Sequence, residues 1–215
     1  MIIIKLWWSV FADKSKENFI DFEYLHNFAN IIKSINDKII LIHWTWNIWH
    51  WFVKKYWLNH NNYPKLEEVL NNFFDKIDKV FKDFDRIKYN KLEHIDKINK
   101  NIIIWWDINK TKIISSDEIF ANISKKYDIK KSYILTDVDW VLDKNQKIIK
   151  NINKDNIDKI NFWWKEWDVT GGMRNKINFL LESNFPSKII NWKKIDNLKK
   201  VLFEWKWVYS EVEIN

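Results

Sequence analysis

The stretch Ile2-Ile3-Ile4-Lys5-Leu6-Trp7-Trp8-Ser9 decides the fold of this 215-residue chain and introduces its chemistry. Residues 2–6 are mostly β-branched or apolar, which predicts a short buried strand that ends at the tryptophan pair. Similar runs occur at 39–43, 101–104 and 132–136, with helical patterns between them. Strands that alternate with helices predict an α/β protein, a three-layer α/β/α sandwich with a mostly parallel central sheet.

The helices are predicted from apolar residues at helical spacing, over 18–35, 65–84, 117–126 and 174–183. The helix at 65–84 has the clearest apolar face. Ligands of such sheets bind beyond the carboxyl ends of the strands. We therefore expect the functional residues in the loops that directly follow the strands.

Sixteen tryptophans and only two glycines make the composition unusual. The tryptophans stand in turn and loop contexts, where the backbone needs positive φ or close approach to a ligand and glycine is expected. Counting them as glycine gives a glycine content of about 8%, near the average of about 7%. We interpret most or all of them as UGA codons that the organism reads as glycine, as some bacterial lineages do. The alternative is an aromatic-faced binding protein, and the codons of the gene decide between the two.

The net charge of +7 comes from lysines that are dispersed along the chain, and only two arginines are present. We attribute this excess to A/T-rich codons, and expect phosphorylated small ligands rather than nucleic acid. The chain has no cysteine, which excludes disulfides and thiolate metal sites. No apolar run approaches 18 residues and the first residues do not resemble a signal peptide, so we expect a cytoplasmic protein without a membrane span.

The loops after the first two strands have phosphate-binding character once glycine is restored. Trp7 and Trp8 as glycine would expose consecutive N–H groups to a phosphate, and Lys5 could neutralise a transferring phosphoryl group. Residues 43–51 would read His-Gly-Thr-Gly-Asn-Ile-Gly-His-Gly, an anion-binding loop in which His50 could donate to a phosphate. An ordinary turn with a solvated lysine and a structural histidine is the alternative.

Two more motifs follow in the second half of the chain. Thr136-Asp137-Val138-Asp139 ends a strand, and its carboxylates could hold a ribose or orient a lysine near a metal-bound nucleotide; a polar turn is the alternative. Asp168-Val169-Thr170-Gly171-Gly172-Met173 precedes a predicted helix, and Lys176 lies one turn into it. A helix N-terminus with a nearby lysine makes a phosphate site.

In this order and spacing, the four motifs resemble the amino acid kinase superfamily, and within it most closely the isopentenyl phosphate kinases. The resemblance covers nearly the whole chain, and Asp168–Met173 is its most specific part. It implies an amino acid kinase-like fold with an acceptor-side lobe at 1–100 and a nucleotide-binding lobe at 101–215. Family glycines other than Gly171 and Gly172 are tryptophan here or, at position 45, threonine.

The resemblance also implies roles for the residues that match. Catalytic roles are implied for Lys5, Lys14 and His50. Contacts to the acceptor are implied for Thr45, His50 and Trp106. Contacts to ATP are implied for Lys5, Trp7, Trp8, Ser9, Trp46, Asp137, Gly172 and Lys176. Mg²⁺ would accompany ATP, with no metal ligand assigned to the protein.

The implied activity is phosphoryl transfer from ATP to a small phosphate monoester, with isopentenyl phosphate first among the candidates. The segment between His50 and Trp105 is shorter than is usual in the family, which affects the acceptor's hydrocarbon pocket; helix 65–84 could line it or be plain core. Other acceptors (a nucleoside monophosphate, a phosphonate or a carboxylate) and a non-catalytic nucleotide- or effector-binding domain are the alternatives. A homodimer is a further expectation.

Overall fold

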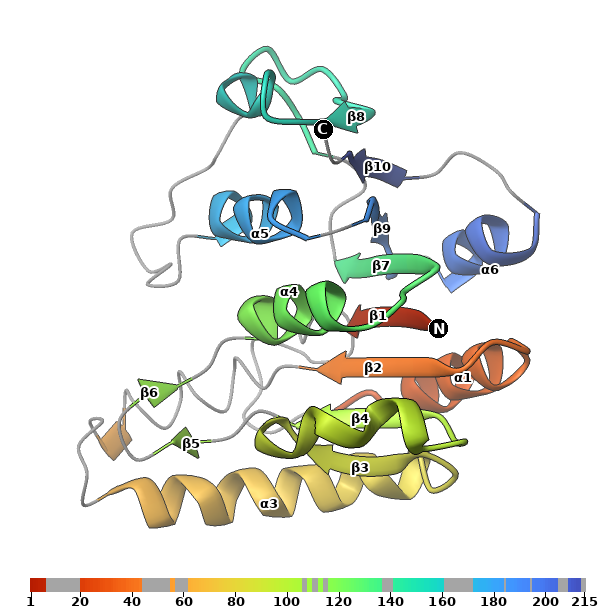
Figure 1. The fold of residues 1–215 in the computed structure, drawn as a ribbon, viewed down its shortest axis with the longest axis vertical. Helices are drawn as coiled ribbons and strands as arrows, with labels where there is room; N and C mark the ends of the chain where they lie inside the picture. Colours follow the sequence, from red (N-terminus) through yellow and green to blue (C-terminus); the bar gives the residue numbers. More distant parts are fainter. Residues whose placement is uncertain are drawn as a thin grey trace.

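The computed structural model describes residues 1–6, 20–43, 55–56, 62–105, 108–109, 112–113, 116–136, 141–160, 172–183, 185–193, 195–204 and 209–213. Within them, one eight-stranded sheet has the order β3-β4-β2-β1-β7-β9-β10-β8 (Figure 1). Its strands are β1 Ile2–Leu6, β2 Ile39–His43, β3 Asp85–Lys88, β4 Ile102–Trp105, β7 Lys131–Thr136, β8 Asn151–Ile152, β9 Ser187–Asn191 and β10 Tyr209–Val212. A separate antiparallel pair is formed by β5 Ile108–Asn109 and β6 Lys112–Ile113.

The sheet is mostly parallel, as the sequence predicts. β3, β4, β2, β1, β7 and β9 pair in parallel, and β10 is antiparallel to β9. Strands β1 and β2 coincide with the predicted runs and are buried along their full length. A strand buried on both faces carries apolar side chains throughout, which explains why these runs are continuous rather than alternating.

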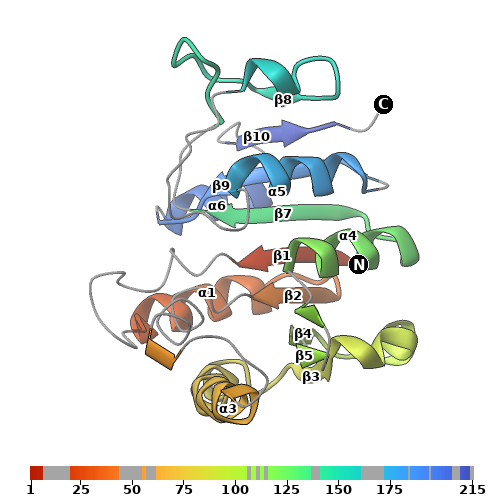
Figure 2. The same ribbon diagram turned by 90° about the vertical axis from the view of Figure 1, so that its left-hand side faces the viewer.

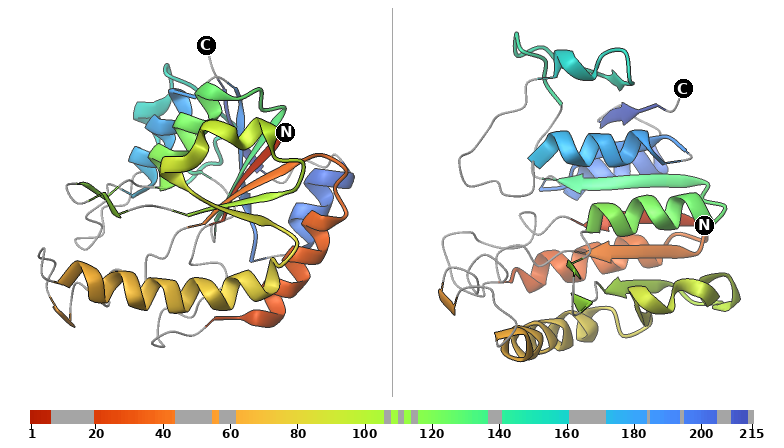
Figure 3. Two further views of the ribbon diagram at one scale, coloured as in Figure 1. Left: turned by 60° about the horizontal axis from the view of Figure 1, so that its bottom comes forward. Right: turned by 60° about the vertical axis from the view of Figure 1, so that its left-hand side comes forward.

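Helices cover both faces of the sheet (Figures 1–3). Figure 3 shows α4 and α5 on one face and α1 and α6 on the other, with α3 beside α1. The helices are α1 Phe22–Lys33, α3 Tyr63–Val80, α4 Ser116–Lys126, α5 Gly172–Leu181 and α6 Ile195–Phe203, with the 3₁₀ segments η3 Tyr89–Lys97 and η4 Ile157–Lys159. This is the predicted α/β/α sandwich.

The two longest predicted helices differ most from the structure at their ends, and the other two begin one or two residues earlier than predicted, at Ser116 and Gly172. Helix α1 begins later than expected because Asp21 caps it: the Tyr24 N–H donates to the Asp21 carboxylate at 2.9 Å. Helix α3 begins at Tyr63, with Pro64 in its first turn, and ends at Val80 rather than 84. Phe81 and Phe84 lie in the following turn and are still buried, so their apolar spacing extended the prediction beyond the helix.

Trp192, which directly follows β9, is the one tryptophan whose side chain lies among the described residues. Its ring is fully buried and meets Phe28 and Tyr24 edge to face, with centroids 4.8 and 5.6 Å away. Its carbonyl accepts a hydrogen bond from the Tyr24 hydroxyl at 2.9 Å. The indole Nε1 has no hydrogen-bond partner among the described residues. A buried unsatisfied donor costs about 1–3 kcal/mol.

No helix within the described ranges has the length and apolar character needed to cross a membrane.

Candidate active site

The loops that carry the sequence motifs leave the sheet side by side. Leu6 at the end of β1 is in register with His43 of β2 and with Leu135 of β7. Neighbouring strands are about 4.8 Å apart, so the segments that follow these three strands begin next to one another. The motif residues outside the described ranges are Trp7, Trp8, Ser9, Lys14, Thr45, Trp46, His50, Trp106 and Asp137. The structure therefore describes the strand ends from which the motifs start, and the positions of Lys5, Gly172 and Lys176.

Lys5 is the most telling of the described site residues, because its side chain is completely buried in the central strand of the sheet. Its Nζ forms an ion pair with the carboxylate of Asp117, the second residue of α4. Burial lowers the pKa of Lys5, and the charge of Asp117 and its hydrogen bond oppose that shift. The pairing fixes a cationic group at the carboxyl edge of the sheet, where a phosphate could be held.

Asp117 was not among the residues selected from the sequence. It is acidic in the first turn of its helix, as is Glu118, a pattern that is common simply because carboxylates favour a helix N-terminus. Its side chain is 18% exposed and lies 112 residues from Lys5 in the chain. The sequence shows the helix start, but only the packing of α4 against the sheet shows that this carboxylate reaches Lys5.

Helix α5 brings Gly172 and Lys176 to the same edge of the sheet. It begins at Gly172 and leads into β9, which runs parallel to β7, so the helix N-terminus faces the carboxyl ends of the strands (Figure 1). Lys176 is 3% exposed and lies one turn into the helix. A buried lysine beside a helix N-terminus can stabilise bound phosphate. Lys5 and Lys176 thus come from the two predicted lobes and lie on elements that meet at one edge.

His43, the last residue of β2, is a buried histidine on the face opposite Lys5. It is in register with Leu6, whose side chain points away from the face of Lys5, and its ring lies 5.0 Å from that of Phe74 of α3, at an angle of 65°. Burial, with a smaller contribution from the charge of Arg86, lowers the pKa of His43 to about 3. The ring is therefore neutral at physiological pH and cannot supply positive charge to a phosphate.

The next question is whether the described residues include ligands for Mg²⁺. In the described part of the chain, no three His, Cys, Asp or Glu side chains are grouped as metal ligands. Mg²⁺ that accompanies a nucleotide takes most of its ligands from phosphate oxygens and water, and needs few protein carboxylates.

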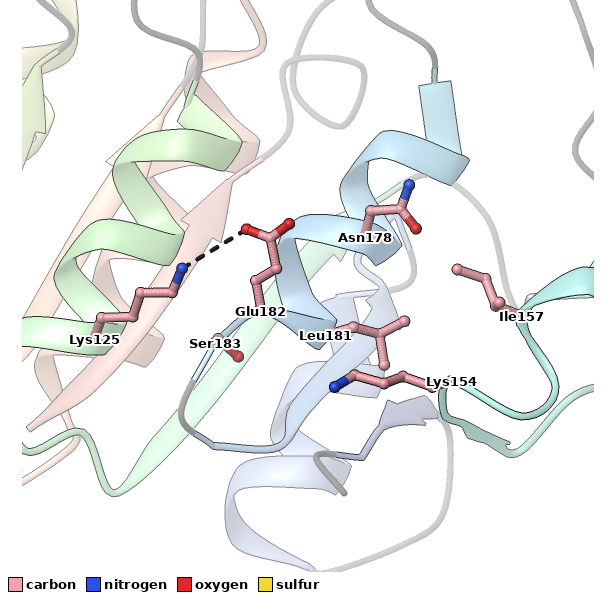
Figure 4. Close-up of a pocket in the computed structure, with 7 residues that line it drawn as sticks. All are labelled: Lys125, Lys154, Ile157, Asn178, Leu181, Glu182 and Ser183. Carbon is pink, nitrogen blue, oxygen red and sulfur yellow. Dashed lines mark ion pairs between the residues drawn. The ribbon is translucent and has the colours of Figure 1, made fainter.

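A pocket of about 650 Å³ lies away from Lys5 and Lys176 (Figure 4). It is lined by residues at the C-terminal ends of α4 and α5 and by the segment around η4, namely Lys125, Lys154, Ile157, Asn178, Leu181, Glu182 and Ser183. Lys125 and Glu182 form an ion pair of 3.7 Å across it. Because both helices point their N-termini to the motif loops, this pocket is at the other edge of the sheet and is not the candidate active site.

Comparison with known protein families identifies the class to which this fold, with Lys5 and Lys176 buried near one edge of the sheet, belongs. The chain matches the amino acid kinase family over residues 68–185, and it belongs to that family. Among curated proteins it is similar to the isopentenyl phosphate kinase of Methanocaldococcus jannaschii, with 27% identity over 248 aligned positions, covering 94% of this chain and 95% of the relative.

Solved structures agree in fold. An isopentenyl phosphate kinase in complex with its substrate superposes with a TM-score of 0.74 and 14% identity over 99% of both chains. The UMP kinase of Ureaplasma parvum superposes with a TM-score of 0.66 and 17% identity, over 99% of this chain and 98% of that one. At these identities the likeness establishes the amino acid kinase fold alone.

Proposed function

We propose that this protein is an ATP-dependent kinase that phosphorylates isopentenyl phosphate to isopentenyl diphosphate. The observation that carries the proposal is the buried Lys5, held by Asp117 at the carboxyl end of the central strand, in a chain of the amino acid kinase family. Similarity to the M. jannaschii isopentenyl phosphate kinase over nearly the full length of both chains supports this acceptor.

In this proposal the protein acts by positioning and charge stabilisation, without a covalent intermediate. Lys5 neutralises the transferring phosphoryl group, and Asp117 keeps its ammonium group in place. Lys176 and the start of α5 at Gly172 hold the ATP phosphates. Lys14 is assigned to the same phosphates, and His50 to the phosphate of the acceptor. The remaining contacts are assigned as the family resemblance implies.

The two halves of the chain are assigned different tasks: residues 1–100 to the acceptor and 101–215 to the nucleotide. The sheet contains strands from both halves, with β1 and β7 paired at its centre, which would keep donor and acceptor in fixed relation. We assign ATP with Mg²⁺ as the phosphoryl donor, a homodimer as the assembly and the cytoplasm as the location.

We also propose that the tryptophans are glycines in the native protein, read from UGA. The turn and loop contexts in which most of the tryptophans stand support this proposal, because the backbone there needs the freedom of glycine. Mass spectrometry of the protein from its own host tests it: each Trp-to-Gly replacement lowers the mass by about 129 Da, a value set by the two residue formulas. Peptides with tryptophan at these positions, or UGG codons in the gene, would overturn it.

The activity is tested by measuring ADP release from the full chain made with glycine at the sixteen positions. The chain with tryptophan at these positions is the comparison. We expect turnover with isopentenyl phosphate, and little with UMP, a carboxylate or a phosphonate. Greater kcat/KM with UMP would move the assignment to a nucleoside monophosphate kinase. A folded chain that binds ATP but turns over no acceptor would favour a non-catalytic nucleotide-binding domain.

A further inference from the structure

A second pocket, of about 200 Å³, lies at the beginning of β7 and β9. Its lining includes three lysines and the phenol of Tyr133. The full lining consists of Lys130, Lys131, Ser132, Tyr133, Pro186, Lys188 and Glu211. None of these residues belongs to the sequence motifs described above. The pocket needs its own explanation, because positive charge that lines a hollow raises the local concentration of anions.

The pocket and the candidate active site are on different edges and different faces of the sheet. Lys5 points towards α4 and is in register with Ile134, so Tyr133 next to it points to the opposite face. Residues 131 to 136 run from the pocket to the carboxyl edge, a span of about 16 Å at ~3.3 Å per residue. A ligand in the pocket would not touch Lys5.

Three strands contribute side chains to this face at the same level. Lys188 of β9 is directly opposite Tyr133 of β7 on one side and Glu211 of β10 on the other. Residues opposite one another in a sheet share a face and have Cβ atoms about 5 Å apart. The phenol, one ammonium group and one carboxylate therefore form a row across the pocket.

Tyr133 supplies a hydrogen-bond donor at the wall of the pocket. The residue is 2% exposed, lines the pocket, and its hydroxyl makes no hydrogen bond with any residue that the structure describes. Burial, together with nearby Tyr209, Asp37 and Glu211, raises the pKa of Tyr133 to about 12. The phenol thus keeps its proton and remains able to donate. The hydroxyl is not one of the buried polar atoms that lack a partner in the described residues, so it is open to the pocket, where water or a ligand atom can accept its hydrogen bond.

Lys188 and Lys130 are only partly neutralised by carboxylates of the described residues. Lys188 Nζ lies 4.2 Å from the ring centroid of Tyr209, and no carboxylate of the described chain lies within ion-pair distance of it. Lys130 has a long pairing of 3.7 Å with Asp37, which is 39% exposed. Glu211 lines the pocket and makes no ion pair with a described residue. The negative charge of Glu211 repels an anion in the pocket, so removing that charge should tighten anion binding.

We propose that this pocket binds a small multiply charged oxyanion of the phosphate class, with Lys188 and the Tyr133 hydroxyl as its main contacts and Lys130 and Lys131 as supporting charge. Charge-assisted hydrogen bonds from ammonium groups and a phenol are the contacts that such an anion requires. The pocket is too small for a nucleotide base and sugar, so inorganic phosphate and diphosphate are the two candidate sources. The proposal does not depend on the kinase acceptor.

The test is calorimetric titration of the full chain with phosphate and with diphosphate, each against chloride at matched ionic strength. The titration uses the version of the chain that unfolds cooperatively, with either glycine or tryptophan at the sixteen positions. We expect Lys188→Gln to weaken binding about tenfold or more and Tyr133→Phe to weaken it several-fold. Glu211→Gln should tighten binding several-fold, because a like charge is removed. A purely structural role for these residues would not produce opposite signs.

Two controls separate this pocket from other anion sites. The double variant Lys5→Met with Asp117→Leu removes a contact of the candidate active site together with its counter-charge, and should leave the pocket's affinity unchanged, even if the kinase proposal fails. Lys154→Gln removes a lysine of the larger pocket and should also leave it unchanged. No binding above chloride up to about 50 mM anion, or equal affinity in the Lys188 and Glu211 variants, would overturn the proposal.

Discussion

Replacing Asp117 by asparagine should destabilise the protein and abolish its activity together. Lys5 is completely buried, and Asp117 provides its counter-charge. Removing one member of a buried ion pair leaves an uncompensated charge and costs about 3–5 kcal/mol. This is a large part of the 5–15 kcal/mol typical of a domain. The double variant Lys5→Met with Asp117→Leu removes both charges, and should recover most of that stability while remaining inactive.

Urea unfolding gives the free energies by linear extrapolation, and ADP release gives the activity. Asp196→Asn is the matched control, because Asp196 is also acidic in a first helical turn but is 73% exposed in its weak pairing with Lys199. It should cost no more than about 1 kcal/mol, the size of a helix-dipole contribution. If Asp117→Asn costs as little as Asp196→Asn, or the double variant is as unstable as the sum of its parts, the buried pair does not have the role inferred for it.

Three further variants test the site and its surroundings. His43, with a pKa of about 3 when folded and about 6.5 when unfolded, binds a proton more readily in the unfolded chain, so stability should fall by about 1 kcal/mol per pH unit as pH drops from 6.5 to 5. Unfolding of His43→Leu should lack this slope, and an unchanged slope would contradict the assignment. Lys176→Met should lower kcat/KM for ATP about 100-fold, and a wild-type KM for ATP would exclude it from the nucleotide site. His50→Ala should lower kcat/KM for the acceptor about 100-fold or more, and near wild-type turnover would remove His50 from the site.

The sequence predicted the parts of the fold in which burial alone determines the pattern. Strands β1 and β2 are buried along their full length because helices cover both faces, and apart from Lys5 and His43 they are apolar, so their limits could be read directly. The edge strand β3 was missed because its residues, Asp85–Lys88, are mostly exposed and polar and show no apolar run. Strand β9 is as long as β1 but has only two apolar residues in its sequence SKIIN, and β10, with the sequence YSEV, is half polar, so neither shows a continuous apolar run. Helix α6 was also not predicted.

The motifs of the candidate site could be predicted from the sequence, whereas the ion pair between Lys5 and Asp117 could not. Lys5 and Lys176 were found because each lies next to a glycine-like loop or a helix start. That both would be buried, and that Asp117 would meet Lys5, depends on how α4 and α5 pack on the sheet. Such contacts between distant residues leave no local signal in a single sequence.

The central position of β1 constrains the order in which the chain can mature on the ribosome. The first strand made is in the interior of the finished sheet, between β2 and β7, and β7 is synthesised about 125 residues later. Until then one edge of β1, an apolar strand of four residues around Lys5, has no strand to pair with. Unpaired apolar edges promote association between chains. Nascent chains that stop before residue 131 should therefore aggregate or recruit chaperones, and protection should appear only once β7 has emerged.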